Sequence, residues 1–279
     1  MPVTRPALSS HIGTLNGLVA YMAPDELNRG VTMLNFMIWP VLLVAAARPS
    51  TIRSTLQGRM LAAAVILLTL FTTFYSAHET SKVALLFAGA IYALYAYAPK
   101  IARGLVVGGW VTATVLIVPL VERAYQSNLH LTHWIPENGR ARLIIWAATA
   151  EQFHRHPVLG IGADNTSVLD EMNTAAVLRP GHVYPWRTGM HAHNIYLQTW
   201  YELGLVGAML LLAIGLVILR WISVLPDVSQ RFMLATFVSA AVIGAFGFGM
   251  WQLWLVAGYF LSTTLALLAI KYSQLQLRA

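Results

Sequence analysis

Seven apolar stretches of the amino-acid sequence are each long enough to form a helix that crosses a lipid bilayer. They cover residues 31–47, 59–76, 82–98, 101–121, 199–219, 231–249 and 251–270. A bilayer-spanning helix needs about 20 predominantly apolar residues, and inside lipid a helix satisfies the backbone hydrogen bonds of such a stretch. The pattern therefore predicts an all-α fold: a polytopic transmembrane helical bundle that forms one integral-membrane domain over residues 1–279.

The composition agrees with a membrane protein. The chain of 279 residues is 57% hydrophobic and 10% charged, whereas a soluble domain carries about 25% charged residues. The formal net charge of +7 would also suit a nucleic-acid-binding protein. In so apolar a chain, arginines that set the membrane topology and an anionic ligand explain it better. We therefore expect a lipid bilayer and no nucleic acid as partner. The absence of cysteine excludes disulfides and thiolate chemistry.

Basic residues between the apolar stretches predict how the chain lies in the membrane. Lysine and arginine gather in the short loops on the cytoplasmic side. With seven spans, one side of the membrane receives Arg48, Arg53, Arg59, Lys100, Arg103, Arg220, Arg231, Lys271 and Arg278. We interpret this side as cytoplasmic, which places the long segment 122–198 on the periplasmic side.

The segment 122–198 is a predicted periplasmic catalytic loop within the membrane domain. Loops longer than about 60 residues escape the charge rule, so the arginines of this loop do not contradict the orientation. A loop of this length in a compact protein is usually functional. The apolar residues of 142–153 recur at helical spacing and predict an amphipathic helix against the mouth of the bundle.

Reactive side chains gather where this loop gives way to the fifth apolar stretch. His191, His193, Asn194 and Glu202 all lie within residues 191–202. Histidine exchanges protons near neutral pH, and a carboxylate beside a membrane span is costly and often functional. This border is where we expect a membrane enzyme to hold a reactive group between water and lipid.

Two sequence blocks identify a family. Residues 142–146 (RLIIW), followed by residues 153–162 (FHRHPVLGIG), resemble the "R-x-x-x-W … h-P-x-x-G-i-G" block of the O-antigen ligase and polymerase superfamily. Residues 193–197 (HNIYL), with ELG at 202–204 and Gly207, resemble its "H-N-x-x-L … E-x-G-x-x-G" block. Either block alone is a weak signal. The pair, in this order between two membrane spans, is fairly specific, and the chain most resembles the O-antigen ligases.

A third region adds to the resemblance. Residues 27–30 (LNRG), leading to Trp39-Pro40, look like the family's "N-R … W-P" region. Members of this superfamily usually have about a dozen spans, whereas seven are predicted here. The resemblance therefore implies that this chain corresponds to the C-terminal part of a family member, without the N-terminal helices.

The resemblance implies a membrane glycosyltransferase of the bacterial inner membrane with its active site facing the periplasm. Such an enzyme moves O-antigen glycan from undecaprenyl diphosphate to a sugar hydroxyl of the lipid A core, in lipopolysaccharide biosynthesis. By resemblance the reaction is inverting and needs no metal or other cofactor. An O-antigen polymerase, which uses a second lipid-linked glycan as acceptor, and a protein-glycosylating relative remain alternatives, because the shared motifs do not set the acceptor.

The chemistry assigns roles to the matched residues. A base must activate the acceptor hydroxyl, and His193 of the matched motif is our candidate. The diphosphate leaving group gains negative charge as the bond breaks, and arginine binds phosphate oxygens in a bidentate way without deprotonating. Arg142, Arg140 and Arg29 are the candidates for this task.

Further residues have both a functional and a structural interpretation. His191 is a substrate-binding helper or a structural histidine, and Asn194 is a sugar ligand or the cap of the next helix. Glu202 is a catalytic candidate that acts directly or orients a histidine or an arginine. Arg187 is a further candidate for the diphosphate, although solvated loop arginines are common.

Two other function classes fit the sequence less well. Four imidazoles, in the pairs His154/His156 and His191/His193, could hold zinc or copper, but no carboxylate cluster accompanies them. A transporter or channel with a gating outer loop would need more charged residues in its spans than this sequence has. We therefore expect no metal site, and we expect an enzyme rather than a transporter.

Overall fold

The computed structural model describes residues 24–47, 56–172 and 178–278. Its helices are α1 (Pro24–Ala46), α3 (Leu56–Tyr75), α4 (Glu79–Tyr97), α5 (Pro99–Val115), α6 (Ile117–Gln126), the 3-10 helix η1 (Leu129–Leu131), α7 (Glu137–Phe153), α8 (Asn165–Met172), α9 (Ile195–Ile222), α10 (Asp227–Phe246) and α11 (Leu253–Arg278). No strand is present in these ranges, so the predicted all-α fold is confirmed. Arg48 and Arg53, which contribute to the predicted orientation, lie outside the described residues.

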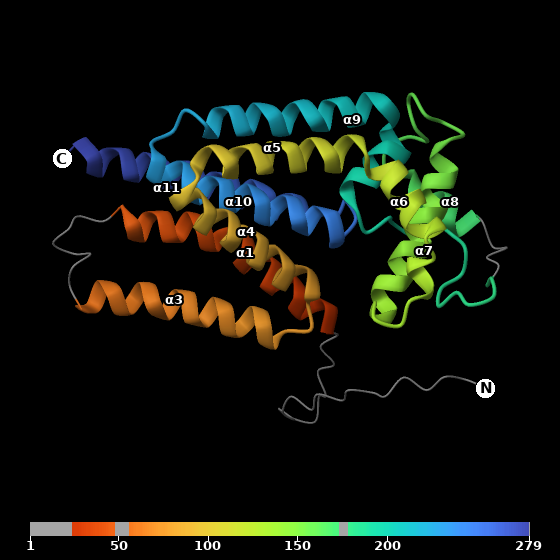
Figure 1. Cartoon of the computed structure of the whole chain (residues 1–279), viewed down its shortest axis with the longest axis horizontal. Coiled ribbons are helices and arrows are strands. Elements are labelled where there is room, and N and C mark those ends of the chain that lie inside the picture. The colour runs from red at the N-terminus through yellow and green to blue at the C-terminus, as the bar shows by residue number, and fades with distance from the viewer. Residues whose placement is uncertain (1–23, 48–55, 173–177, 279) are drawn as a thin grey trace.

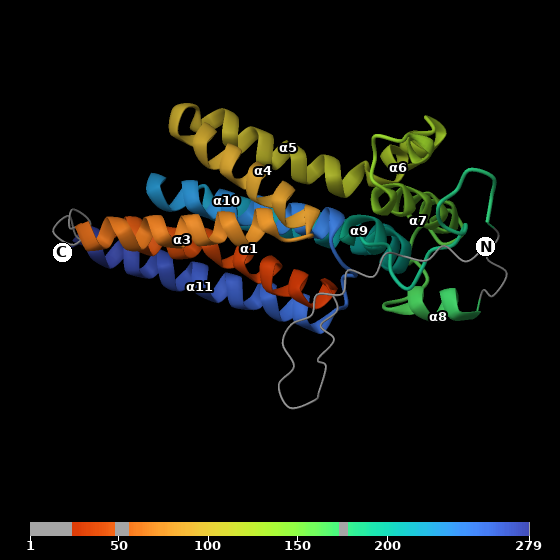
Figure 2. The same cartoon turned by 90° about the horizontal axis from the view of Figure 1, so that it is seen from below.

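The long helices form a bundle along the long axis of the molecule, and the short helices gather at one of its ends (Figure 1). The view from below shows the same division (Figure 2). We call the group at this end the cap, which consists of residues 117–172 and 178–194. The cap contains nearly all of the predicted periplasmic loop 122–198.

Six of the long helices are apolar and long enough to cross a membrane: α1, α3, α4, α9, α10 and α11. A seventh span is possible only if α5 and α6, which are bent by 73° at their junction, count as one. The chain is thus a multi-pass membrane protein. The predicted span 101–121 differs from a straight helix because Pro119 has no backbone N–H and its ring clashes with a carbonyl four residues back. The break at Leu116 places Pro119 in the first turn of α6, where both problems disappear.

Helix starts follow from local sequence. Proline is favoured in the first turn or just before it, because its missing N–H is not needed there. Pro99 is the first residue of α5, and Pro136 and Pro226 immediately precede α7 and α10. Helices α7 and α10 each begin with an acidic residue, which complements the positive end of the helix dipole.

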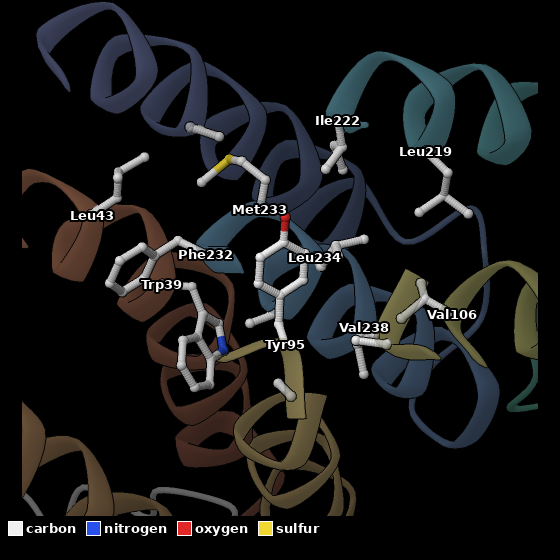
Figure 3. Close-up of a cluster of buried hydrophobic side chains, with 14 of the residues drawn as sticks. Trp39, Leu43, Tyr95, Val106, Leu219, Ile222, Phe232, Met233, Leu234 and Val238 are labelled. Carbon is white, nitrogen blue, oxygen red and sulfur yellow. The ribbon is translucent and has the colours of Figure 1, made fainter. Parts of the chain in front are cut away.

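The core of the bundle lies where α1, α4, α5, α9, α10 and α11 meet (Figure 3). Its labelled members are Trp39, Leu43, Tyr95, Val106, Leu219, Ile222, Phe232, Met233, Leu234 and Val238. In lipid the hydrophobic effect does not drive helices together, so close packing and interhelical hydrogen bonds must. Ser239 of α10 and Ser262 of α11 each donate such a bond to a carbonyl of α1, at 3.1 and 2.7 Å.

The middle of helix α7 is buried in the cap on all its sides. Each residue from Ile144 to Ala150 is buried. The Trp146 indole donates a hydrogen bond to the carbonyl of Ala192 at 2.7 Å, which ties α7 to the segment that precedes α9. The helix expected within 142–153 is therefore present, but its neighbours enclose it.

Helix α9 breaks at Gly204, and the segment 157–162 of the cap fills the break. The hydrogen bonds run from Ile161 N to Tyr201 O (3.1 Å), Gly162 N to Glu202 O (2.9 Å), Leu205 N to Pro157 O (2.9 Å) and Val206 N to Val158 O (3.3 Å). In an uninterrupted helix the α9 groups would have paired with each other. The cap thus replaces two helical hydrogen bonds by four bonds of its own.

Two glycines make this close approach possible. Gly204 has φ 62° and ψ −156°, a conformation that is essentially confined to glycine. A Cβ atom on it would lie 2.4 Å from the carbonyl carbon and oxygen of Val158. Gly160 has φ +68°, and a Cβ there would lie 2.3 Å from the carbonyl of Glu202. One glycine of each family block, Gly160 and Gly204, is therefore required by the backbone contact between the blocks.

We expect Gly204→Ala to destabilise the protein strongly. Backbone strain alone costs about 1–3 kcal/mol, and the collision with Val158 adds to it. Thermal unfolding of the purified protein in detergent should show a clear fall in Tm. Gly108→Ala is the matched control, because Gly108 lies within α5 and a Cβ atom added there would have nothing within 4 Å. An equal loss of stability in both variants would contradict this account.

Candidate active site

The candidate active site lies between the cap and the bundle. Arg142 comes from the first turns of α7, and His191 and His193 come from the segment just before α9. The third component is the C-terminal end of α10, where the carbonyls of Phe246 and Gly247 accept hydrogen bonds from the site. Segments far apart in the sequence therefore converge on one end of α10.

Arg142 is partly buried and has no carboxylate within ion-pair distance in the described part of the chain. Its Nη1 donates to the Phe246 carbonyl at 2.5 Å and lies 3.5 Å from the Thr80 hydroxyl. Burial lowers the pKa of Arg142, but a guanidinium stays charged at neutral pH. The site therefore holds a positive charge that no described acidic side chain neutralises.

His193 donates a hydrogen bond from Nδ1 to the Gly247 carbonyl at 3.1 Å. Because a carbonyl only accepts, Nδ1 carries the proton, and Nε2 of the neutral ring keeps its lone pair. Burial, the neighbouring His191 and the charge of Arg142 lower the pKa of His193 to about 4, against the opposing effect of the Gly247 bond. The ring is thus neutral near pH 7, with a basic nitrogen that has no described partner.

His191 packs edge to face against His193, with ring centroids 4.1 Å apart and an interplanar angle of 83°. Its Nε2 lies 3.2 Å from the side-chain nitrogen of Gln252. The oxygen of that amide accepts a bond from Trp254 at 3.0 Å, so the amide nitrogen is the group that faces His191 and donates. Burial is the main reason that the pKa of His191 is lowered, and Arg142 adds to the effect.

The turn between α3 and α4 supplies residues that the motifs did not indicate. His78 is buried, its Nδ1 lies 2.7 Å from the Ser81 hydroxyl, and its ring packs on Phe248. Burial and the charge of Arg142 lower the pKa of His78 to about 4. Thr80, also buried, donates to the same Phe246 carbonyl at 3.0 Å. A polar turn between two apolar spans was the available sequence signal.

Asn194 is the N-cap residue of α9. Its side-chain oxygen accepts a bond from the backbone N–H of Leu197 at 3.0 Å, and the residue is 1% exposed. The preceding residue, His193, has φ 52°, a left-handed conformation that is uncommon for residues other than glycine. This N-cap hydrogen bond fixes the start of α9. The left-handed conformation of His193 turns its imidazole toward the end of α10.

Glu202 is fully buried, and its carboxylate accepts four hydrogen bonds. The donors are Asp164 N (3.0 Å), Thr166 Oγ1 (2.5 Å), Gln198 Nε2 (2.9 Å) and Trp251 Nε1. None of them belongs to the site histidines or arginine. Glu202 instead connects the start of α8, the first turns of α9 and the segment before α11.

The other predicted arginines lie at different places. Arg29 on α1 is exposed, and its guanidinium lies 5.7 Å from the centroid of the Trp254 ring. The Trp254 indole bonds to the Gln252 amide that contacts His191. Arg140 is partly buried on α7, two residues before Arg142, and its Nε is buried without a described partner. Arg187 is paired with the buried Asp170 and lines a separate cavity of the cap.

The alternative with four metal-binding imidazoles does not describe the arrangement found. His154 is at the end of α7, where it lies 2.6 Å from Glu122 of α6. Among residues 24–47, 56–172 and 178–278, no group of three or more histidine, aspartate or glutamate side chains is placed to hold a metal ion. The two histidine pairs therefore do not form one such group.

Similar proteins place this site in context. Three curated relatives, from Rickettsia conorii, Rickettsia felis and Rickettsia typhi, are named "putative polysaccharide ligase" and are each 23% identical to this chain. The matches cover 82–83% of this chain and 54–55% of the relatives. The chain thus spans about half the length of the curated relatives it matches.

The sequence profile of the O-antigen ligase family matches residues 62–212, which is more than half of the chain. The matched range contains Arg142, both site histidines and the two blocks that pair across the break in α9. It confirms the family that these blocks predicted. The chain belongs to the O-antigen ligase family.

Proposed function

We propose that this protein transfers a glycan from undecaprenyl diphosphate to a hydroxyl of a lipid A-core sugar, at the periplasmic face of the inner membrane. The proposal rests above all on one observation: the unneutralised charge of Arg142 lies beside a neutral histidine with a free ring nitrogen. A site of this kind can bind an anionic leaving group and accept a proton from a nucleophile.

Arg142 would stabilise the diphosphate as it leaves. The bond from the sugar C1 to the phosphate oxygen breaks, and the electron pair stays on the diphosphate. A fixed cation at this position stabilises the developing charge most when water is excluded. Arg140 precedes Arg142 by two residues on α7, and Arg29 lies over Trp254, whose indole bonds to the Gln252 amide beside His191; both arginines would hold the remaining phosphate oxygens. In this account no metal ion is needed to neutralise the leaving group.

His193 would act as the base. Nε2 takes the proton of the acceptor hydroxyl as its oxygen attacks the sugar C1 from the face opposite the diphosphate, which inverts the configuration. The hydrogen bond from Nδ1 to Gly247 holds the ring in the tautomer that this step needs. His191 limits the rotation of the ring by packing against it, and Asn194 holds the start of α9.

Donor binding would also strengthen the base. In the free protein, burial, His191 and Arg142 all disfavour the imidazolium form of His193. A bound diphosphate brings negative charge next to Arg142 and offsets its effect. The pKa of His193 should therefore rise toward neutrality when the donor is bound, which makes the ring a better proton acceptor at the pH of the reaction.

We expect His193→Ala and Arg142→Gln each to abolish most of the transfer activity. Loss of a general base typically lowers the rate by about 10²–10⁴-fold, and loss of a stabilising donor by about 10²–10³-fold. The assay uses purified protein in liposomes with undecaprenyl-diphosphate glycan, lipid A core and EDTA. His133→Ala and Arg123→Gln are matched controls, since both residues lie elsewhere on the cap.

Each result of this assay has a clear meaning. Transfer in EDTA that is lost in the two site variants and kept in the two controls would support the proposal. Longer lipid-linked glycans without transfer to lipid A core would identify a polymerase. Activity that EDTA removes and zinc restores, or full activity of His193→Ala, would overturn the mechanism.

The pH dependence tests the base separately. His193 must be neutral, so activity is lost as the pH falls through its pKa. Because that pKa is about 4 in the free protein, kcat/KM for the donor should stay constant from about pH 8 down to about pH 5 and fall below that. The acid limb of kcat should lie at higher pH, because bound diphosphate raises the pKa. An acid limb of kcat/KM near the ordinary histidine value would contradict the burial of this ring.

Glu202 would be a positioning residue rather than a catalytic one. In Glu202→Gln, the amide NH₂ group must face at least one of the present hydrogen-bond donors, at a cost of about 1–3 kcal/mol. We expect a lower Tm for this variant in detergent and an unchanged acid limb of kcat/KM. A shifted acid limb with an unchanged Tm would instead indicate a direct role in proton transfer.

A further inference from the structure

The cap contains a second site candidate, a cavity of about 570 Å³. Its lining includes Arg155, His156, Arg179, Trp186, Arg187 and Tyr201. Neither Arg142 nor the site histidines line it. Cavities of this size accommodate small organic ligands, and nothing in the proposed transfer chemistry uses these residues.

Two of the three arginines of this cavity, Arg179 and Arg187, are held in place by neighbouring side chains. Arg187 forms an ion pair with Asp170, which is 3% exposed and also accepts a bond from Gly189 N at 3.0 Å. The Arg179 guanidinium lies 3.8 Å from the centroid of the Trp186 ring. Holding these side chains before a ligand arrives reduces the entropy lost on binding.

The charge of the cavity is mainly positive. Three arginines line it, and the one acidic side chain in its lining is Glu151. Arg155 and Arg179 have no carboxylate within ion-pair distance in the described ranges, and the Nε of Arg187 is buried there without a hydrogen-bond partner. Several guanidinium groups thus have donors left for an anionic ligand, and such groups bind carboxylate and phosphate in a bidentate way.

We propose that this cavity binds an acidic saccharide, a sugar unit that carries a carboxylate or a phosphate, within the acceptor glycan. The identity of the occupant as part of a glycan rests on the proposed function. Thr188 lines the cavity and precedes His193 by five residues, so the two are at most about 18 Å apart along an extended chain. A short oligosaccharide spans that distance, with its acidic unit in the cavity and its reacting hydroxyl at His193.

The lining favours a saccharide over a membrane lipid. It comes mostly from α7, α8 and the loops of the cap, and among the described residues Tyr201 is its only member from a candidate span. Gln152 and Thr188 add an amide and a hydroxyl that can bond to sugar hydroxyl groups. Two exposed apolar side chains of α8, Leu169 and Met172, also line the cavity, whereas long runs of exposed apolar side chains lie on the long helices, as in α3 with Leu67, Leu68 and Phe71.

The test measures binding without transfer. Trigalacturonic acid and the neutral maltotriose are titrated into the protein in phosphatidylcholine nanodiscs, and heat release gives Kd. We expect the acidic trisaccharide to bind at least tenfold more tightly, and Arg179→Gln and Arg155→Gln each to remove most of this preference. Arg123→Gln, a cap arginine outside the cavity, should leave it unchanged. Arg187 is kept, because its loss would leave the buried carboxylate of Asp170 without its ion-pair partner.

Three results would overturn the inference. The first is equal binding of the two trisaccharides. The second is an effect of Arg123→Gln equal to that of the cavity variants. The third is that phosphatidylglycerol nanodiscs block binding in a way that depends on Arg179. The last result would identify a lipid headgroup site.

The binding test is separable from the transfer reaction. His193→Ala should bind trigalacturonic acid like the parent protein, because His193 does not line the cavity. Selective binding together with failed transfer would count against the proposed function and keep the cavity as an acidic-saccharide site. Transfer that needs His193, without selective binding, would count against the cavity alone.

Discussion

The backbone contact between the cap and the break in α9 is the interaction on which the rest of the structure depends. A membrane helix that breaks must have its freed backbone groups satisfied, since an unpaired group in an apolar surrounding is costly. The segment 157–162 provides those partners. In doing so it fixes α7, which ends just before it, and α8, which follows it. Arg142 and much of the lining of the cationic cavity belong to these elements. Four main-chain hydrogen bonds therefore help to position both groups of side chains relative to α9.

The second constraint is electrostatic. A partly buried guanidinium without a described counter-ion is unfavourable in a protein without ligand, because Arg142 loses solvation there, and any imidazolium formed beside it would be repelled by its charge. His78, His191 and His193 accordingly all have lowered pKa values. The site accepts a cost in the empty state that an anion would relieve. Charge would therefore be the main criterion for an anion at this site, which would suit the diphosphate proposed as the leaving group.

The sequence predicted the spans and the family well, because apolar length and motif spacing are local signals. It predicted the bent α5–α6 pair less well: proline is tolerated in many membrane helices, so Pro119 alone did not show that the helix breaks at Leu116. At the site, Arg142 and His193 were identifiable as side chains, but their partners are the carbonyls of Phe246 and Gly247. Main-chain groups leave no trace in residue identity. Arg187 resembled the other loop arginines until its pairing with Asp170 separated it from them.

The proposed cation, Arg142, and the proposed base, His193, donate hydrogen bonds to adjacent peptide units at the end of α10. Arg142 contacts the carbonyl of Phe246, and His193 contacts that of Gly247. Neighbouring peptide units keep a nearly constant separation, since consecutive Cα atoms are about 3.8 Å apart whatever the helices around them do. Changes in bilayer thickness or helix tilt would therefore move both groups together. Covalent geometry thus limits the spacing between the proposed cation and the proposed base, and the two groups need no rigid membrane around them to stay in register.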